Sequence, residues 1–303
     1  MQSITIGTRG SKLALWQAHW IEKQLNDLGV ETAIEVIKTT GDKITDVALA
    51  KVGAESGLKG VFTKEIEEAL LDGRIDVAVH SMKDLPTEID DRLVVAVVPK
   101  RADARDAIVG RRVDELQKGA KIGTSSLRRA AQLRHFRPDI DVLDIRGNVD
   151  TRLRKLDEGQ YDAILLASAG LHRLGWEDRI AEILDPGVMV PAVGQGALGV
   201  ETRSDDEAVR GLLAPLHDKE TATAVAAERA LLDALGGGCQ VPLGANAVVT
   251  GETMNLTAVV VSPDGKRVVK AGQTGAPNQP AKLGWQTAQQ LVAEGAREIM
   301  DAA

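Results

Sequence analysis

The chain has 303 residues, of which 44% are apolar. At ~100–200 residues per domain this length allows two or three compact units, each with a core, and it excludes an intrinsically disordered protein. The formal net charge of −7 disfavours nucleic acid as the main ligand, because binding to phosphate needs a basic footprint. Four Trp, two Phe and one Tyr are too few for a platform that stacks bases. The single cysteine, Cys239, excludes an intrachain disulfide and a thiolate metal cluster.

The start of the chain has the pattern of neither a secretion signal nor a membrane anchor. Met1 leads directly into a strand-like stretch at residues 4–7, without a basic segment followed by an apolar one. No stretch approaches ~18 uninterrupted apolar residues, the length that a membrane-spanning helix needs. We therefore expect a cytoplasmic protein with no membrane partner.

Charge is distributed unevenly along the chain. Residues 101–180 carry 13 of the 21 arginines and a net charge of +3, whereas the rest of the chain carries −10. Arginine is favoured over lysine where a planar carboxylate or phosphate is bound bidentately. Composition leaves two interpretations open: arginine-rich helix faces paired with neighbouring acids, or a pocket for a polyanion.

The first hundred residues alternate strands and helices. Apolar residues at helical spacing predict helices, and short β-branched runs predict buried strands. The predicted order is strand 4–7, helix 12–28, strand 34–38, helix 64–71 and strands 75–79 and 93–98. This order favours an open parallel sheet with right-handed crossovers.

The alternation restarts after Pro99 and then changes character. The second set is strand 121–123, helix 127–136, strand 142–145, helix 149–156 and strand 163–167. A helix at 221–235 follows, and then strands at 247–250, 256–261 and 267–270 and a last helix at 281–300. A hairpin turn at residues 263–265 joins the last two of these strands, which predicts an antiparallel sheet.

The predicted fold class is α/β, with two α/β domains and a small C-terminal α+β domain that has an antiparallel sheet. Domain 1 comprises residues 1–98 and 195–216, domain 2 residues 99–194, and domain 3 residues 217–303. Because two segments cross between the first two domains, we expect a hinge with a ligand cleft.

Polar segments follow three predicted strands, at residues 8–11, 124–129 and 146–152. Open α/β sheets bind ligands beyond the carboxyl ends of their strands, and the N–H groups at helix N-termini favour anions. Each segment alone is also explained by ordinary helix capping. Together they predict a cleft for a ligand with several carboxylates.

Asp84 follows the predicted strand 75–79, in a turn ahead of Pro86. A carboxylate there can accept a proton or stabilise a developing cation, although turns and caps also use aspartate. His80, for which the sequence identifies no partner, is interpreted as a structural residue.

Cys239 follows three glycines at the end of the predicted helix 221–235. A lone cysteine is commonly a small buried hydrophobe. An open glycine loop would instead expose the thiol as a nucleophile or attachment point. The residues alone leave both interpretations open.

Six motifs, in order, resemble those of the hydroxymethylbilane synthase (porphobilinogen deaminase) family: residues 7–18, 79–84, 123–129, 146–149, 191–197 and 237–242. The resemblance covers nearly the whole chain. It implies a transferase of tetrapyrrole (heme) biosynthesis that links porphobilinogen units head to tail, loses ammonia at each step and releases linear hydroxymethylbilane by hydrolysis. It also implies a monomer with α/β domains like those of type II periplasmic binding proteins, with no metal or nucleotide required.

The resemblance further implies a site. A dipyrromethane cofactor, which primes the chain, is attached to Cys239 by a thioether, and Asp84 is the catalytic carboxylate. A loop over the cleft corresponds to residues 51–60 and is longer than the commonest family form, so Lys51 and Lys59 are both candidates for its lysine. The other implied cofactor- and substrate-binding residues are Arg9, Ser11, Ser81, Lys83, Thr124, Ser125, Ser126, Arg128, Arg129, Arg146, Gly147, Arg152, Arg173 and Gln195.

The alternative function is a non-catalytic, two-lobed binding protein for a polycarboxylate ligand. Such a protein would explain the polar strand ends and the hinge. It would not explain the third domain or the glycine-rich loop at Cys239.

Overall fold

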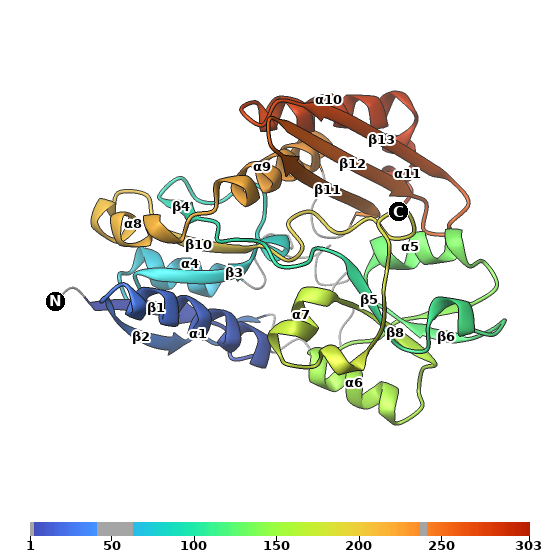
Figure 1. The fold of residues 1–303 in the computed structure, drawn as a ribbon, viewed down its shortest axis with the longest axis horizontal. Coiled ribbons are helices and arrows are strands. Elements are labelled where there is room, and N and C mark those ends of the chain that lie inside the picture. Colours follow the sequence, from blue (N-terminus) through green and yellow to red (C-terminus); the bar gives the residue numbers. More distant parts are fainter. Residues whose placement is uncertain (1–2, 41–62, 237–240) are drawn as a thin grey trace. The chain divides into compact units, whose positions relative to one another are not determined.

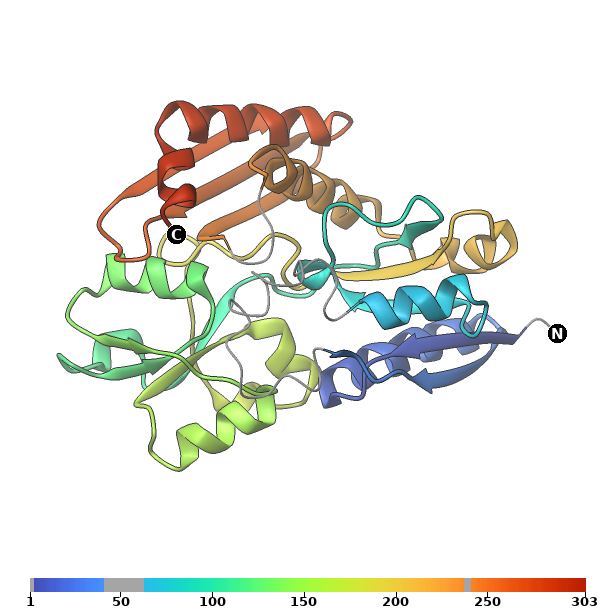
Figure 2. The same cartoon turned by 180° about the vertical axis from the view of Figure 1, so that it is seen from behind.

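The computed structural model of the chain describes residues 3–40, 63–236 and 241–303. The chain divides into two compact units: unit 1 comprises residues 1–100 and 198–219, and unit 2 comprises residues 101–197 and 220–303. Figure 1 labels most of their elements, and Figure 2 shows the same ribbon from behind. No helix among the described residues is long and apolar enough to cross a membrane.

Unit 1 is built on one five-stranded sheet with the order β2-β1-β3-β10-β4. Helix α1 begins where the Ser11 hydroxyl accepts a hydrogen bond from the amide of Ala14 at 3.2 Å, and it ends ahead of Gly29, whose φ is 79°. The strands are β1 (Ser3–Thr8), β2 (Glu31–Val36), β3 (Val77–Ser81), β4 (Leu93–Val97) and β10 (Leu198–Arg203), and the helices are α1 (Lys12–Asp27), α4 (Lys64–Leu71) and α8 (Glu207–Leu213).

Helices cover both faces of this sheet. On one face, Ile6 of β1 shares a core with Ile21 of α1 and Val209 of α8. On the other face, Ala78 of β3 shares a core with Leu70 of α4. Because both faces are covered, residues of the central strand β3 are buried on both sides of the sheet, from Val77 to His80.

The prediction that the sheet of unit 1 is all parallel is wrong for one strand. Strand β1 runs parallel to β2 and β3, but β10 is antiparallel to both β3 and β4. Strand β10 was not expected from the sequence, because its residues directly follow a segment rich in proline and glycine, residues 186–196. The direction of a strand is set by hydrogen bonds to distant residues, and local periodicity does not contain that information.

Unit 2 contains two sheets, and the first has the order β7-β6-β8-β5-β9. On one face, Leu133 of α5 shares a core with Ile122 and Leu165, and on the other Leu153 of α6 shares a core with Ile164. The elements are β5 (Asp106–Gly110), β6 (Lys121–Gly123), α5 (Leu127–Phe136), β7 (Asp141–Leu143), α6 (Val149–Asp157), β8 (Ala163–Ala167), α7 (Ser168–Arg173) and β9 (Ile180–Ile183).

Strand β5, which the sequence analysis missed together with β9, is antiparallel to its neighbour β8, whereas β6 is parallel to β7 and β8. Its first residue, Asp106, therefore pairs with the last residue of β8, Ala167. As a result, Asp106 lies at the edge of the sheet where the three parallel strands end.

The second sheet of unit 2 is antiparallel, as predicted, with the order β11-β12-β13. Leu256 of β12 shares a core with Leu231 of α9 and Leu291 of α10. The predicted helix 281–300 is two helices, because Gly295 has a φ of 94° and interrupts it. The elements are α9 (Lys219–Ala234), β11 (Leu243–Thr250), β12 (Thr253–Val261), β13 (Val268–Gly275), α10 (Pro280–Ala293) and α11 (Ala296–Asp301).

The α/β class, its two helix-covered sheets and the small antiparallel C-terminal sheet are thus confirmed. The boundaries of the three domains and the hinge with its cleft stay predictions.

Candidate active site

Three parallel strands end at one edge of the first sheet in unit 2. Strand β6 leads into residues 124–126 and α5, β7 leads into residues 144–148 and α6, and β8 leads into α7. Parallel neighbours have their carboxyl ends at the same edge. The fold therefore brings together the arginines and hydroxyls that the sequence analysis had found in separate segments.

Arg128 and Arg129, in the first turn of α5, are buried and share one carboxylate. Nη1 of Arg128 lies 2.7 Å from Oδ2 of Asp106, and Nε of Arg129 lies 2.8 Å from Oδ1. Arg128 also donates to the carbonyl of Val190 at 2.8 Å, and Arg129 donates to that of Leu165 at 3.2 Å. Among the described residues, Nε of Arg128 has no hydrogen-bond partner.

Asp106 is the site residue that the sequence analysis missed. Burial alone would raise the pKa of this carboxyl, but the charges of Arg128 and Arg129 outweigh burial and hold the pKa well below its usual range. The only local signal was an acidic residue directly ahead of the apolar run 107–109. Its pairing with the arginines depends on the antiparallel direction of β5, which that run does not reveal.

Gln195, which the family resemblance implied, is buried and contacts the same carboxylate. Its Nε2 donates to Oδ1 of Asp106 at 3.0 Å, and its Oε1 accepts from Nη2 of Arg129 at 3.3 Å. Arg173, at the end of α7, donates to the carbonyl of Gly196 at 2.7 Å. Within unit 2, the segment that contains Gln195 and Gly196 is thus hydrogen-bonded to the arginines at the carboxyl ends of the parallel strands.

The segment that follows β7 carries two more of the implied arginines. Nε of Arg146 lies 2.7 Å from Oδ2 of Asp144, and Nε of Arg152 donates to the carbonyl of Gly147 at 2.8 Å. Gly147 has a φ of 109°, and a Cβ there would lie 2.7 Å from the side chain of Thr151. Glycine is therefore needed at this turn, and its carbonyl orients Arg152.

Three hydroxyl residues follow β6. Thr124 Oγ1 accepts from the amide of Ser126 at 3.2 Å, Ser125 Oγ donates to the carbonyl of Ile145, and Ser126 Oγ accepts from the amide of Arg129 at 3.4 Å. They line a hollow of about 220 Å³. Capping is thus confirmed for Ser126, and a capping hydroxyl still has its own proton to donate.

The electrostatics of this edge favour an anionic ligand. Burial, and then the like charges of Arg129 and Arg146, lower the pKa of Arg152 to about 10. Burial likewise lowers the pKa of Arg173 to about 10. Lowered values mean that the environment disfavours the charged guanidinium, and ligand carboxylates would stabilise it.

The binding residues of unit 1 that the family resemblance implied lie at the carboxyl ends of β1 and β3, which are parallel neighbours. Arg9 directly follows β1, and Ser11 caps α1. Ser81 ends β3, where its Oγ accepts a hydrogen bond from Nε2 of Gln17 at 2.8 Å. The strand order therefore gathers these side chains at one edge of the unit 1 sheet.

Asp84 and Lys83 lie in a short 3-10 turn, η1 (Met82–Asp84), directly after β3. Asp84 is exposed, whereas Met82, the first residue of the turn, and Leu85, which directly follows it, are each only 2% exposed. The backbone of the turn is thus anchored by two buried apolar side chains while the carboxylate stays accessible.

Three of the implied site residues lie outside the described residues: Cys239 and the two candidate loop lysines, Lys51 and Lys59.

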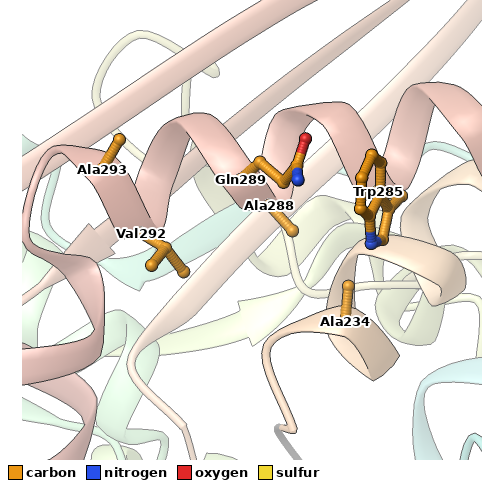
Figure 3. A pocket seen from close by; sticks show the side chains of 6 residues that line it. All are labelled: Ala234, Trp285, Ala288, Gln289, Val292 and Ala293. Carbon is orange, nitrogen blue, oxygen red and sulfur yellow. The ribbon is translucent and has the colours of Figure 1, made fainter.

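A hollow of about 290 Å³ between α9 and α10 has a different chemistry. Figure 3 shows Trp285 and its neighbours on α10 together with Ala234 of α9. None of the described residues that line it has an ionisable side chain, so they offer no charged group to pair with a carboxylate. Its lining residues are Ala234, Trp285, Ala288, Gln289, Val292 and Ala293.

Two family models match this chain. The model described as "Porphobilinogen deaminase, dipyromethane cofactor binding domain" matches residues 4–211, which is more than half of the chain. The chain belongs to the porphobilinogen deaminase family. A second model, "Porphobilinogen deaminase, C-terminal domain", matches residues 222–293 and includes the position of Cys239.

Porphobilinogen deaminases from several bacteria are similar over nearly the full length. The protein from Syntrophobacter fumaroxidans is 50% identical over 303 residues, which cover 98% of this chain and 97% of that one. The protein from Trichlorobacter lovleyi is 51% identical over 302 residues, which cover 98% and 96%. Among solved structures, the methionine binding protein MetQ has a TM-score of 0.45 at 14% identity, covering 75% of this chain and 94% of that one.

These findings confirm the family that the motifs indicated. They also confirm its transferase activity on porphobilinogen, hydroxymethylbilane synthesis, and its dipyrromethane cofactor. The porphobilinogen deaminase function is favoured over the non-catalytic binding protein, which would not account for a match to both family models.

Proposed function

We propose that the arginine-rich edge of unit 2 holds the carboxylates of the dipyrromethane cofactor and of the growing tetrapyrrole. The observation that carries this proposal is that Arg128 and Arg129, both buried, share the single carboxylate of Asp106, which leaves an excess of positive charge at this edge. Each pyrrole ring brings an acetate and a propionate. A chain that lengthens ring by ring therefore needs several guanidiniums to hold it.

The other side chains of this edge divide into two groups. Arg146, Arg152 and Arg173 bind carboxylates, because a planar guanidinium donates two parallel hydrogen bonds to a carboxylate. Asp106 orients the arginines, and Gln195, which contacts Asp106 and Arg129, binds cofactor and substrate beside them. The remaining donors are the hydroxyls of Thr124, Ser125 and Ser126.

The cofactor, when bound, supplies the free α-carbon to which each new unit is added. We assign its thioether to Cys239, the only cysteine of the chain. Gly147 contributes through its backbone, since its positive φ lets its carbonyl accept from Arg152.

Asp84 is the proposed catalytic carboxylate. Loss of ammonia from porphobilinogen leaves positive charge on the pyrrole of the substrate. A carboxylate within reach of the pyrrole N–H stabilises that charge, and it accepts a proton as the new carbon–carbon bond is completed. The exposure of Asp84 on a turn anchored by Met82 and Leu85 supports this role.

The remaining donors of unit 1 bind substrate and cofactor. These donors lie at the same edge of the unit 1 sheet as Asp84, which supports their assignment to one site. They are Arg9, Ser11, Ser81 and Lys83. Lys51 or Lys59 supplies the lysine of the loop over the cleft.

We further propose a cytoplasmic monomer with the domain limits predicted from the sequence. The interval between the two matched family models, residues 211–222, supports a third domain that begins near residue 217. A hinge between the first two domains would make room for the lengthening chain.

Intact mass and turnover of three proteins test the proposal. The parent carries an adduct of two pyrrole units and Cys239→Ser has the mass of the bare chain. Asp84→Asn keeps the adduct but loses turnover by about 10²–10⁴-fold, the usual contribution of a positioned acid or base. A parent with the mass of the bare chain would overturn the Cys239 assignment, and near-normal turnover of Asp84→Asn would overturn the role of Asp84.

A further inference from the structure

A buried polar pair lies behind the turn that carries Asp84. Nε2 of His80, on β3, is 3.1 Å from Oε2 of Glu201, on β10. The side chains are 5% and 0% exposed. Strands β3 and β10 are antiparallel neighbours, side by side in Figure 1. The pair therefore connects the strand that leads into the catalytic turn with the strand beside it.

Burial of this pair costs free energy, because its surroundings do not satisfy both side chains. Glu67, on α4, faces the same space, and burial, with the negative charge of Glu201, raises the pKa of its carboxyl. In the part of the chain that is described, Oε1 of Glu201 has no hydrogen-bond partner. A buried charged pair is often no more stabilising than two apolar side chains of similar size. Stability alone therefore does not account for His80 and Glu201.

The pair is one of three interactions at the end of β3. Successive residues of a strand point to opposite faces, so His80 is tied to β10 on one face while Ser81 is tied to Gln17 of α1 on the other. Directly beyond, Met82 packs against Gly199 of β10, where a Cβ would lie 2.9 Å from the Met82 Cε atom. The backbone is thus held from both sides over three consecutive residues before it reaches Asp84.

We propose that His80 and Glu201 are positioning residues for Asp84. Their hydrogen bond fixes the end of β3, so that the turn presents the catalytic carboxylate at a constant place relative to the sheet edge. Because the Asp84 side chain is exposed, its position depends on the backbone that precedes it. This inference rests on the proposed catalytic role of Asp84.

Three variants separate positioning from stability. Glu201→Gln keeps a hydrogen bond to His80, since an amide donates to or accepts from the ring in either tautomer. Glu201→Met has a similar length and no group that bonds the ring in this way. The double variant His80→Leu/Glu201→Met removes both polar groups of the pair, so that neither is left buried without the other, and it is expected to fold with nearly the Tm of the parent.

We expect kcat of the double variant to fall by at least about tenfold while KM changes by less than about twofold, because an interaction that serves only the transition state is lost. Glu201→Met should lose kcat to a similar extent. Glu201→Gln should lose no more than about threefold, which is the rescue expected of a retained hydrogen bond. Intact mass should show the cofactor adduct on all three variants.

The exposed pair His19–Glu22 on α1, at 2.8 Å, supplies the matched control. Glu22→Gln and Glu22→Met repeat the same changes beside a solvent-exposed histidine and should leave kcat as in the parent. Equal losses of kcat in Glu201→Gln and Glu201→Met would contradict the inference. If the double variant aggregates, the comparison of these two single variants decides the point.

Asp84→Asn, measured in parallel, separates failure of the inference from failure of the proposed function. If Asp84→Asn retains turnover, the catalytic role of Asp84 is wrong. If Asp84→Asn is inactive but the double variant keeps the kcat and Tm of the parent, the positioning role of His80 and Glu201 is wrong.

Discussion

Oδ2 of Asp106 lies 2.7 Å from Nη1 of Arg128, and both side chains are buried. The two residues are 22 positions apart and come from different elements, β5 and α5. The same carboxylate also accepts a hydrogen bond from Arg129. One carboxylate thus balances part of the charge of two guanidiniums, and the arginine-rich edge depends on it.

Asp106→Asn should lower the free energy of unfolding by about 3–5 kcal/mol, because it leaves buried guanidiniums without their charged partner. Denaturant unfolding measures this change. The matched control is Asp139→Asn, which removes a carboxylate from an exposed pair with Arg137 and should have a much smaller effect. Equal effects of the two substitutions would show that burial gives Asp106 no special role.

The stability of the protein should depend on Asp106 in acid. The pKa of this carboxyl in the folded protein lies below that of the unfolded chain, which is about 3.9. Its stabilising contribution is therefore fully present above about pH 4 and is lost as the pH falls toward the folded pKa. Between about pH 4 and pH 2, the free energy of unfolding should fall more steeply for the parent than for Asp106→Asn. Parallel pH profiles would refute this.

Arg152→Gln should slow elongation by about 10–100-fold, because a charge-assisted hydrogen bond of ~1.5–3 kcal/mol to a ligand carboxylate is lost. Its Tm should equal or exceed that of the parent, since Arg129 and Arg146 repel the Arg152 charge. Turnover, and intact mass of the enzyme-bound chains, measure the effect. The control is Arg154→Gln on the same helix, a side chain that is 63% exposed and should tolerate the change.

Glu228→Gln should destabilise unit 2 by about 3–5 kcal/mol. Glu228, on α9, is buried, and its Oε1 lies 2.6 Å from Nη1 of Arg101 and accepts from the amide of Ala247 at 2.8 Å. Its Oε2 accepts from the amide of Gly194 at 2.7 Å. Thermal unfolding checks the prediction, with the exposed Glu294→Gln as control. A Tm equal to that of the control would contradict it.

Gly284→Ala should destabilise the packing of α10 on α9 by about 1–3 kcal/mol or more, as overpacking does. A Cβ at Gly284 would overlap the carbonyl oxygen of Ala227 and lie 2.8 Å from the amide nitrogen of Leu231, and both are backbone atoms that cannot rotate away. Gly272→Ala on β13 is the control, since a Cβ there meets nothing within 4 Å. Thermal unfolding of both variants decides the point, and equal Tm values would contradict it.

Local pattern was sufficient to locate many elements. Helix 64–71 was predicted with the bounds that the structure has, and strand 121–123 likewise. The last helix was predicted as one segment and is two, because the backbone at Gly295 takes a positive φ that its apolar spacing does not show. His80 was interpreted as structural, and its buried partner Glu201 lies on a strand that the sequence analysis did not predict.

The sequence by itself determined the position of many helices and strands and which polar residues follow those strands, because hydrophobic periodicity and turn chemistry are local properties. Its motifs also indicated the family. Only the tertiary structure decided the direction of β5 and β10, since that depends on hydrogen bonds between distant segments. Those directions place Asp106 beside Arg128 and Glu201 beside His80, and a buried charge is stable only where the fold supplies its partner.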